Sequence, residues 1–139
     1  MTQRPMRRVI GLMSGTSMDG IDAALLETNG EMIRLFGPHL MAPYRSELQE
    51  RIRAVLGGKG PVKQVERDLT IAHAEAVKLL IAQTGPVDLI GFHGQTILHE
   101  PDEGRTWQIG DGALLAELTG TDVVYDFRSN DVARGGAGA

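Results

Sequence analysis

The feature that most constrains the fold is a long stretch with helical periodicity, followed at once by a short segment rich in branched side chains. Apolar residues recur every three or four positions from Val62 to Leu79, and Gly85-Pro86 ends the pattern. Residues 87–92 are too few for a helix and rich in branched side chains, which indicates a buried strand. A strand reached through a crossover helix is typical of a parallel pair. The chain is therefore predicted to contain a partly parallel sheet.

Turn dipeptides divide the first part of the chain into three short strands. Residues 9–13 and 21–27 are apolar segments separated by Asp19-Gly20, a dipeptide that type I′ turns favour. Asn29-Gly30 is a second such dipeptide, and residues 32–36 follow it as a third strand. The pattern predicts an antiparallel three-stranded meander whose first connection is a tight hairpin turn.

The remaining elements complete a mixed sheet. Apolar spacing of three and four over residues 44–55 predicts a helix that Gly57-Gly58 ends. Later residues indicate strands over 107–109 and 121–125, on either side of a helix over 113–118. A meander followed by crossover helices and parallel strands resembles the ribonuclease-H-like unit shared by sugar kinases, actin and heat-shock chaperones. The expected fold class is therefore α/β, with an actin-like ATPase arrangement.

Length and charge exclude several classes of protein. The 139 residues suffice for one domain, and their net charge of −4 provides no basic field for DNA or RNA, so no nucleic-acid partner is expected. The absence of cysteine removes disulfides, thiolate nucleophiles and Cys-type zinc sites. The apolar run over residues 9–13 is too short for a signal peptide or a membrane span. We therefore expect a cytoplasmic protein without a membrane partner.

One loop combines glycines, hydroxyls and acids between the first two strands. Ser14-Gly15-Thr16-Ser17-Met18-Asp19-Gly20 offers backbone amides and three hydroxyl groups to an anion such as phosphate. It lacks the lysine of a Walker P-loop. Asp19 and Asp22 are compatible with bound phosphate only if a hydrated Mg²⁺ lies between. The alternative is an ordinary hairpin turn whose hydroxyls bond the local backbone.

A second polar segment follows the buried strand predicted to end at Phe92. His93-Gly94-Gln95-Thr96 would lie at the carboxyl edge of a parallel sheet, where open α/β folds bind ligands. Imidazole, amide and hydroxyl groups both donate and accept hydrogen bonds, which suits sugar hydroxyls. His99 and Glu100 add two metal-ligating groups, but their spacing from His93 matches no zinc pattern. The alternative is a loop held by its own polar side chains.

The segment after the last predicted strand alternates acids with a base. The planar guanidinium of Arg128 is suited to bidentate binding of a carboxylate or phosphate. Together with Asp126 and Asp131 it would instead form a local ion network, since surface charge pairs are common. Both interpretations stay open at this point.

Four motifs occur in the order found in one family of sugar kinases. They are GLMSGTSMDGID from Gly11, GFHGQTILHEP from Gly91, QIGD with LLAELTG from Gln108, and DFR with DVA and GG from Asp126. On these motifs the chain resembles the anhydro-N-acetylmuramic acid kinase family over almost its whole length. Members of that family are more than twice as long. The resemblance therefore implies that residues 1–139 are the N-terminal actin-like lobe of a longer two-lobe enzyme.

The resemblance also implies a reaction and the residues that serve it. Family members use ATP, Mg²⁺ and water to open the 1,6-anhydro ring of anhydro-N-acetylmuramic acid and to phosphorylate O6, giving N-acetylmuramic acid 6-phosphate in peptidoglycan recycling. The full-length protein is then expected to be a cytoplasmic homodimer. The residues implied to hold ATP are Ser14, Gly15, Thr16, Ser17, Met18, Asp19, Gly20, Ile21 and Asp22, with Asp19 and Asp22 reaching Mg²⁺ through water. Those implied to contact the sugar are His93, Gln95, Thr96, Glu100, Asp126, Arg128 and Asp131.

The catalytic aspartate of the family, which acts as general base, is implied to lie beyond residue 139. The isolated chain is therefore expected to bind ATP weakly and to show no turnover. Ala137 stands where the family has glutamine, which removes one side-chain amide near the sugar. Two alternatives remain: a non-catalytic nucleotide-binding module of the same fold, and a metal-dependent hydrolase that uses His93, His99 and Glu100.

Overall fold

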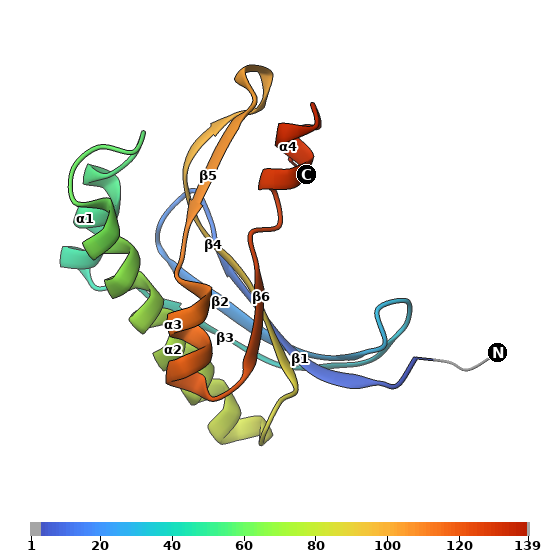
Figure 1. Cartoon of the computed structure of the whole chain (residues 1–139). Helices are drawn as coiled ribbons and strands as arrows, with labels where there is room; N and C mark the ends of the chain where they lie inside the picture. The colour runs from blue at the N-terminus through green and yellow to red at the C-terminus, as the bar shows by residue number, and fades with distance from the viewer. Residues whose placement is uncertain (1–3, 139) are drawn as a thin grey trace.

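The computed structural model describes residues 4–138, which form a six-stranded mixed sheet with helices packed against it (Figure 1). The strands are β1 (Arg7–Ser14), β2 (Gly20–Thr28), β3 (Ile33–Pro43), β4 (Leu89–Glu100), β5 (Arg105–Ile109) and β6 (Asp122–Tyr125). The helices are α1 (Ser46–Ala54), α2 (Val62–Thr84), α3 (Gly112–Thr119) and α4 (Ser129–Ala133), with a 3₁₀ turn at Pro101–Glu103. No helix in the described part of the chain is both long and apolar enough to cross a membrane.

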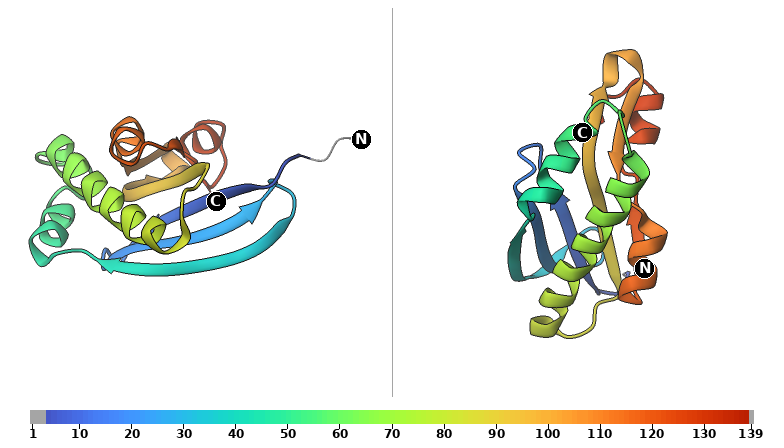
Figure 2. Two further views of the ribbon diagram at one scale, coloured as in Figure 1. Left: turned by 90° about the horizontal axis from the view of Figure 1, so that it is seen from below. Right: turned by 90° about the vertical axis from the view of Figure 1, so that its left-hand side faces the viewer.

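The strand pairing confirms the predicted topology. β1 pairs antiparallel with β2 in an unbroken register from Arg7↔Thr28 to Ser14↔Ile21, and β2 pairs antiparallel with β3. β4 lies parallel to β1, and β6 lies parallel to β4. The crossover helix α2 makes the first parallel pair possible, because it returns the chain to the start of the sheet (Figure 2). The fold is therefore a mixed α/β arrangement, consistent with the expected actin-like ATPase and sugar kinase fold.

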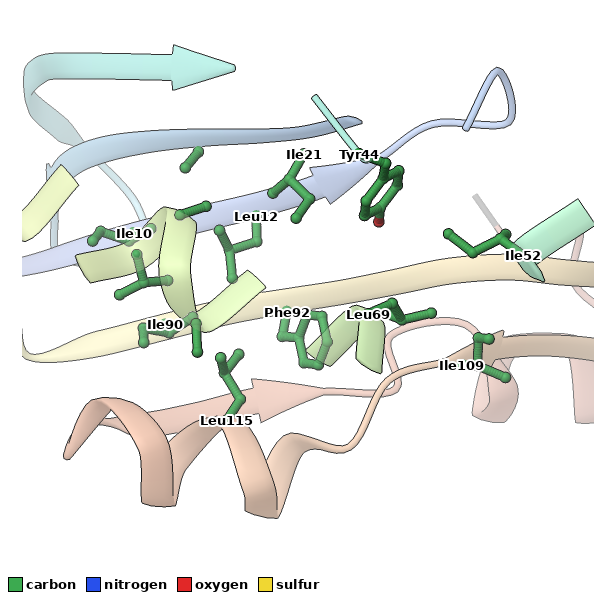
Figure 3. Close-up of a cluster of buried hydrophobic side chains, with 14 of the residues drawn as sticks. Ile10, Leu12, Ile21, Tyr44, Ile52, Leu69, Ile90, Phe92, Ile109 and Leu115 are labelled. Carbon is green, nitrogen blue, oxygen red and sulfur yellow. The ribbon is translucent and has the colours of Figure 1, made fainter. Parts of the chain in front are cut away.

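Alternating apolar side chains of the central strands form the core (Figure 3). The central strands contribute Ile10, Leu12, Ile90 and Phe92, all buried. Leu69 of α2 packs in the same cluster from the helix side. Side chains in a strand alternate between the two faces of a sheet, so the residues between these point away from the helices. The core thus occupies one face of the sheet. The connection from the end of β1 to the start of β2 lies at the rim of the sheet.

The second polar segment of the sequence prediction, residues 93–96, lies inside a strand, so that part of the prediction is wrong. We expected a strand ending at Phe92 and a loop over residues 93–96, but β4 continues to Glu100. Its second half pairs antiparallel with β5, which extends the strand beyond the parallel part of the sheet. Gly94 has a φ of 79°, and a Cβ there would lie 2.5 Å from the carbonyl oxygen of Ile109. This glycine allows an irregularity in mid-strand that local apolar patterns do not reveal.

The β1–β2 connection, residues 15–19, is not the type I′ turn that Asp19-Gly20 suggested. A type I′ turn needs positive φ at both central residues, but the non-glycine residue with positive φ in this connection is Met18, at 58°. Gly20 begins β2 instead, and a Cβ there would lie 2.5 Å from the carbonyl oxygen of Ala42. Glycine is therefore required at residue 20 by the close approach of β3, and not by the turn.

Two further elements differ from the sequence prediction. The pattern indicated a strand only over residues 32–36, because Gly37-Pro38 interrupts the apolar run. In the structure β3 extends to Pro43. An edge strand tolerates proline, since one side of its backbone makes no ladder hydrogen bonds. The short helix α4 was not predicted, and it lies against β5. Both features depend on packing partners that are distant in sequence.

Candidate functional site

The β1–β2 connection presents unpaired backbone amides at the rim of the sheet. Met18 N donates to Gly15 O at 3.0 Å and closes a tight turn. The amides of Gly15, Thr16, Ser17 and Asp19 donate to no backbone carbonyl within residues 4–138. The side chains of Thr16 and Ser17 are exposed beside them. This cluster of free N–H and O–H donors is the local arrangement that binds an anion such as phosphate.

A buried polar cluster lies directly beneath this connection. The Ser14 hydroxyl is 2.7 Å from the Tyr44 hydroxyl and also hydrogen-bonds the Gln95 amide. Ser14 and Gln95 are 2% and 0% exposed, so neither side chain reaches solvent. Burial raises the pKa of Tyr44 to about 12, which keeps its phenol protonated. Tyr44 does not stand out in the sequence, because its apolar spacing places it in a predicted helix that in fact begins at Ser46.

The nine residues expected to hold ATP therefore divide into two groups. The side chains of Ser14 and Ile21 are buried, so these residues can serve a ligand only by supporting the backbone. Gly20 is buried as well, between β1 and β3. Accessible groups come from residues 15–19 and from Asp22, whose side chain is exposed. The loop thus provides mainly main-chain donors to an anion.

The two carboxylates proposed for Mg²⁺ face different surroundings. Asp19 is exposed, and its Oδ1 lies 3.5 Å from Gln49 Nε2 of α1. Asp22 lies opposite Met13 and Met41 on the face of the sheet that the core helices leave uncovered. Within residues 4–138, no three His, Asp or Glu side chains are grouped for direct metal ligation. The donor set therefore fits a hydrated cation held through water and phosphate oxygens, as Mg²⁺ prefers.

A second candidate region is a cavity of about 230 Å³ between β4, β5 and the end of β6. It is lined by His93 and Asp126 of the predicted sugar side, together with Gln108 and Ser129. His93 Nδ1 lies 2.9 Å from Gly94 O, which can only accept, so in the neutral ring Nε2 is left as an acceptor. His93 Nε2 and Gln108 Oε1 are buried without a hydrogen-bond partner among the described residues. The cavity wall therefore carries two unsatisfied acceptors.

Sequence reasoning gave no role to Gln108. Its amide nitrogen donates to Thr96 Oγ1 at 3.2 Å and to Thr106 Oγ1 at 2.8 Å, which leaves the carbonyl oxygen free. The available signal was its position one residue before the buried Ile109, which places it on the opposite face of β5. Thr96, a predicted sugar contact, thus already accepts a hydrogen bond from a neighbouring strand.

The remaining predicted sugar contacts are not gathered in one place. Glu100 ends β4 and pairs with Arg105 at 2.5 Å. Asp126 has a φ of 61° and accepts a hydrogen bond from the Ser129 hydroxyl, whereas Asp131 accepts one from Gly138 N at 2.8 Å. No ion pair joins Arg128 to either aspartate within residues 4–138, so the local ion network is wrong. The Arg128 guanidinium is left without a carboxylate partner in this part of the chain.

The three residues of the metal-hydrolase alternative are engaged elsewhere. His99 Nδ1 lies 2.9 Å from the Thr106 hydroxyl, and Glu100 forms its ion pair with Arg105. His93 is directed to the backbone of Gly94. These residues form no ligand set, in agreement with the absence of a metal-ligating group in residues 4–138. The geometry therefore gives this alternative no support.

Comparison with known proteins identifies a family. The family model for anhydro-N-acetylmuramic acid kinase matches residues 7–139. A protein of that name from Paramagnetospirillum magneticum is 59% identical over 134 residues, which cover 94% of this chain and 38% of the relative. Its namesake from Gluconobacter oxydans is 52% identical over 139 residues, covering 94% of this chain and 38% of the relative. A third, from Agrobacterium fabrum, is 51% identical over 147 residues, covering 96% and 39%. The chain thus spans about two fifths of the length of the curated relatives it matches.

Proposed function

Because the chain belongs to the anhydro-N-acetylmuramic acid kinase family, we propose that it is the phosphate-binding lobe of an ATP-dependent sugar kinase. The complete enzyme would open the 1,6-anhydro ring of anhydro-N-acetylmuramic acid with water and phosphorylate O6. The product would be N-acetylmuramic acid 6-phosphate, formed during peptidoglycan recycling. On the family resemblance alone, we also propose that the full-length enzyme is a cytoplasmic homodimer. The names of the relatives support the substrate, and the β1–β2 connection supports the phosphate site.

The free amides of the β1–β2 connection carry this proposal. Gly15, Thr16, Ser17 and Asp19 offer N–H groups that no backbone carbonyl of residues 4–138 occupies. Such groups, held in place before the ligand arrives, stabilise the charge that develops on phosphate oxygens during transfer. Asp19 and Asp22 would hold a hydrated Mg²⁺ through water, and that ion would neutralise part of the phosphate charge. The connection therefore binds and orients phosphate without a lysine.

The sugar side is assigned to the cavity between β4 and β5. His93 Nε2 and Gln108 Oε1 would accept hydrogen bonds from sugar hydroxyl or amide N–H groups once the cavity opens to a ligand. Arg128, which has no carboxylate partner within residues 4–138, would bind an acidic group of the sugar. Thr96, Asp126 and Asp131 would line this side of the cleft, and Glu100 would lie at its margin. No residue of this chain is assigned as general base.

Nuclear magnetic resonance of the ¹⁵N-labelled 139-residue chain tests the phosphate site. Titration with Mg²⁺·ATP should shift the amide resonances of residues 15–19 with weak affinity, while adenosine should leave them in place. Omitting Mg²⁺ should weaken the response at Asp19 and Asp22. Shifts confined to other residues, or none, would contradict the proposal. We expect no turnover from this chain, because the proposed base lies outside it.

A non-catalytic nucleotide-binding module of the same fold predicts the same amide shifts. The two functions differ in the full-length protein, which should phosphorylate anhydro-N-acetylmuramic acid only if it is a kinase. A coupled ADP-release assay with and without the sugar distinguishes them. Sugar-dependent ADP release supports the kinase, and its absence in a folded full-length protein that binds ATP supports the module.

A further inference from the structure

We propose that Ser14, Tyr44 and Gln95 form a one-directional hydrogen-bond chain that positions the β1–β2 connection for phosphate. The inference rests on the proposed function of that connection. It also gives Gln95 a different role from the sugar contact expected from sequence, because its side chain is 0% exposed. All three side chains are buried, and none of them would touch the ligand. They are therefore positioning residues and not catalytic ones.

The chemistry of the groups determines the direction of the chain. Gln95 Oε1 can only accept, so the Ser14 hydroxyl donates its single proton to it. The Ser14 oxygen must then accept from the Tyr44 hydroxyl, which lies 2.7 Å away. Gln95 Nε2 donates to Gly15 O at 3.2 Å. A flipped amide would place two acceptors against each other at Gly15, so the carbonyl of Gly15 selects the orientation.

This contact orients the amides of the β1–β2 connection. Gly15 O accepts from Gln95 Nε2 and, at 3.0 Å, from Met18 N, so it is directed into the protein. There are no cis peptide bonds in residues 4–138, and in a trans peptide the N–H points opposite to the C=O. Holding the Gly15 carbonyl inward therefore directs the Thr16 N–H outward, to the side where an anion would bind.

Tyr44 holds the other end of the same connection. Its backbone N donates to Asp19 O at 3.0 Å, while its hydroxyl begins the side-chain hydrogen-bond chain. Its ring packs edge-on against His73 with centroids 6.3 Å apart, and His73 packs in turn on Phe92 at 4.8 Å. The support beneath the connection is thus fixed by the core between α2 and β4. One residue fixes both ends of the segment that carries the free amides.

If the network merely stabilises the fold, a variant that breaks it will lower the stability of the chain without changing the β1–β2 connection. A positioning role and a purely structural role are told apart by phosphate binding in two variants that lose a similar amount of stability. Gln95→Met keeps the side-chain length and removes the donor to Gly15. Thr70→Val is the matched control, because Thr70 is also 0% exposed and loses two hydrogen bonds, to Glu66 O and from Asp111 N, in another part of the core.

The test measures the dissociation constant of Mg²⁺·ATP from the amide shifts of the 139-residue chain, alongside urea unfolding. We expect Gln95→Met to weaken binding about three- to tenfold, the equivalent of one hydrogen bond, and to shift the Thr16 amide resonance before ligand is added. Thr70→Val should lower stability but leave both unchanged. If Gln95→Met does not fold, Tyr44→Phe, which keeps the ring, should weaken binding in the same direction by a smaller factor.

The outcomes separate the inference from the function on which it rests. If the wild-type chain shows shifts over residues 15–19 and the Gln95→Met chain binds with equal affinity, the positioning role is overturned and the phosphate site stands. If the wild-type chain shows no shift there, the phosphate site itself is overturned, and the positioning role with it. Equal weakening by Thr70→Val and Gln95→Met would show a purely structural network and would also overturn the inference.

Discussion

Gly20 shows how one residue can be required for a reason that its sequence context conceals. A Cβ at this position would lie 2.5 Å from Ala42 O and 2.8 Å from Pro43 Cα, both backbone atoms of the neighbouring strand. We expect Gly20→Ala to lower the free energy of unfolding by about 1–3 kcal/mol, because the edge strand must move to admit the methyl group.

Urea denaturation measures this loss, and a second glycine provides the control. A Cβ at Gly11, in the adjacent strand, meets no atom within 4 Å, and its φ is not in the left-handed region. Gly11→Ala should therefore be neutral or slightly stabilising, since alanine loses less backbone entropy on folding. Equal destabilisation by both substitutions would contradict the close-approach explanation.

His73 is a buried imidazole whose protonation opposes folding. It is 0% exposed, its Nδ1 bonds Leu69 O at 2.7 Å, and its Nε2 has no partner among the described residues. Burial lowers its pKa from 6.5 to about 4. Between these values the unfolded chain binds a proton that the folded chain does not. Stability therefore falls as the pH drops through this window, by about 3 kcal/mol in all.

The pH dependence of urea unfolding tests this assignment. His73→Phe should flatten the loss of stability between pH 6.5 and pH 4, whereas substitution of the exposed His39 by Gln should leave it unchanged. Glu27, whose pKa is lowered mainly by its hydrogen bond to Arg34, loses its contribution at acid pH in every variant. The difference between the His73→Phe and wild-type profiles therefore isolates the imidazole. Parallel profiles would refute the assignment.

At the scale of elements, Arg8 joins the end of α2 to the start of β1. Its Nη2 donates to Thr84 O at 2.6 Å, its Nε to Pro86 O at 3.0 Å, and its Nη1 lies 3.3 Å from Glu27. The backbone N of Arg8 also donates to Asp88. The planar guanidinium thus binds the carbonyl of the last residue of α2, where cations are favoured, and a second carbonyl in the segment that follows it.

We expect Arg8→Lys to lower the free energy of unfolding by about 1–2 kcal/mol, because an ammonium group cannot satisfy both carbonyls and Glu27 together. Arg7→Lys, at the exposed neighbouring position, should change stability little. Hydrogen exchange of the last turn of α2 should also become faster in the Arg8 variant alone. A stability for Arg8→Lys equal to that of Arg7→Lys would show that the fork geometry has no role.

At the scale of the whole molecule, one face of the sheet remains largely uncovered. Met13 and Met41 flank Asp22 on this face. Val124 of β6 lies on the same face, because it pairs with Gly91 of β4, which pairs in turn with Gly11 of β1. Phe36, on the neighbouring edge strand, is 75% exposed. Apolar side chains gathered on an open sheet face favour association between molecules.

We therefore predict that the 139-residue chain associates with itself as its concentration rises. Phe36→Lys should shift sedimentation profiles toward the monomer. Leu79→Lys, which removes a 59% exposed leucine from α2 on the helix side, should leave the profiles unchanged. A wild-type chain that stays monomeric at all concentrations, or equal effects of both substitutions, would contradict the assignment of the sheet face.

The topology could be predicted from local patterns because each pattern reflects a single element. The spacing from Val62 to Leu79 predicts a crossover helix, and the turn residues near 19 and 29 separate three strands. The same reasoning predicted a phosphate site in the β1–β2 connection, since glycines and hydroxyls lie together in sequence, and the structure shows free backbone amides in that segment. It failed at residues 93–96, because the continuation of β4 depends on pairing with a strand that comes later in the chain.

The amino-acid sequence alone thus determined the class of fold, the order of the six strands and of helices α1 to α3, and the segment with free main-chain donors. The tertiary structure decided what supports that segment. Ser14 meets Tyr44 across 30 residues and Gln95 across 81. The first contact depends on the β2–β3 pairing that reaches Gly20↔Pro43, and the second on the β1–β4 register with its shift beyond Leu12. Hydrogen bonds between side chains act over a few ångströms in space, whatever their separation along the chain. Local patterns describe neighbours in sequence, so only the folded chain reveals such partners.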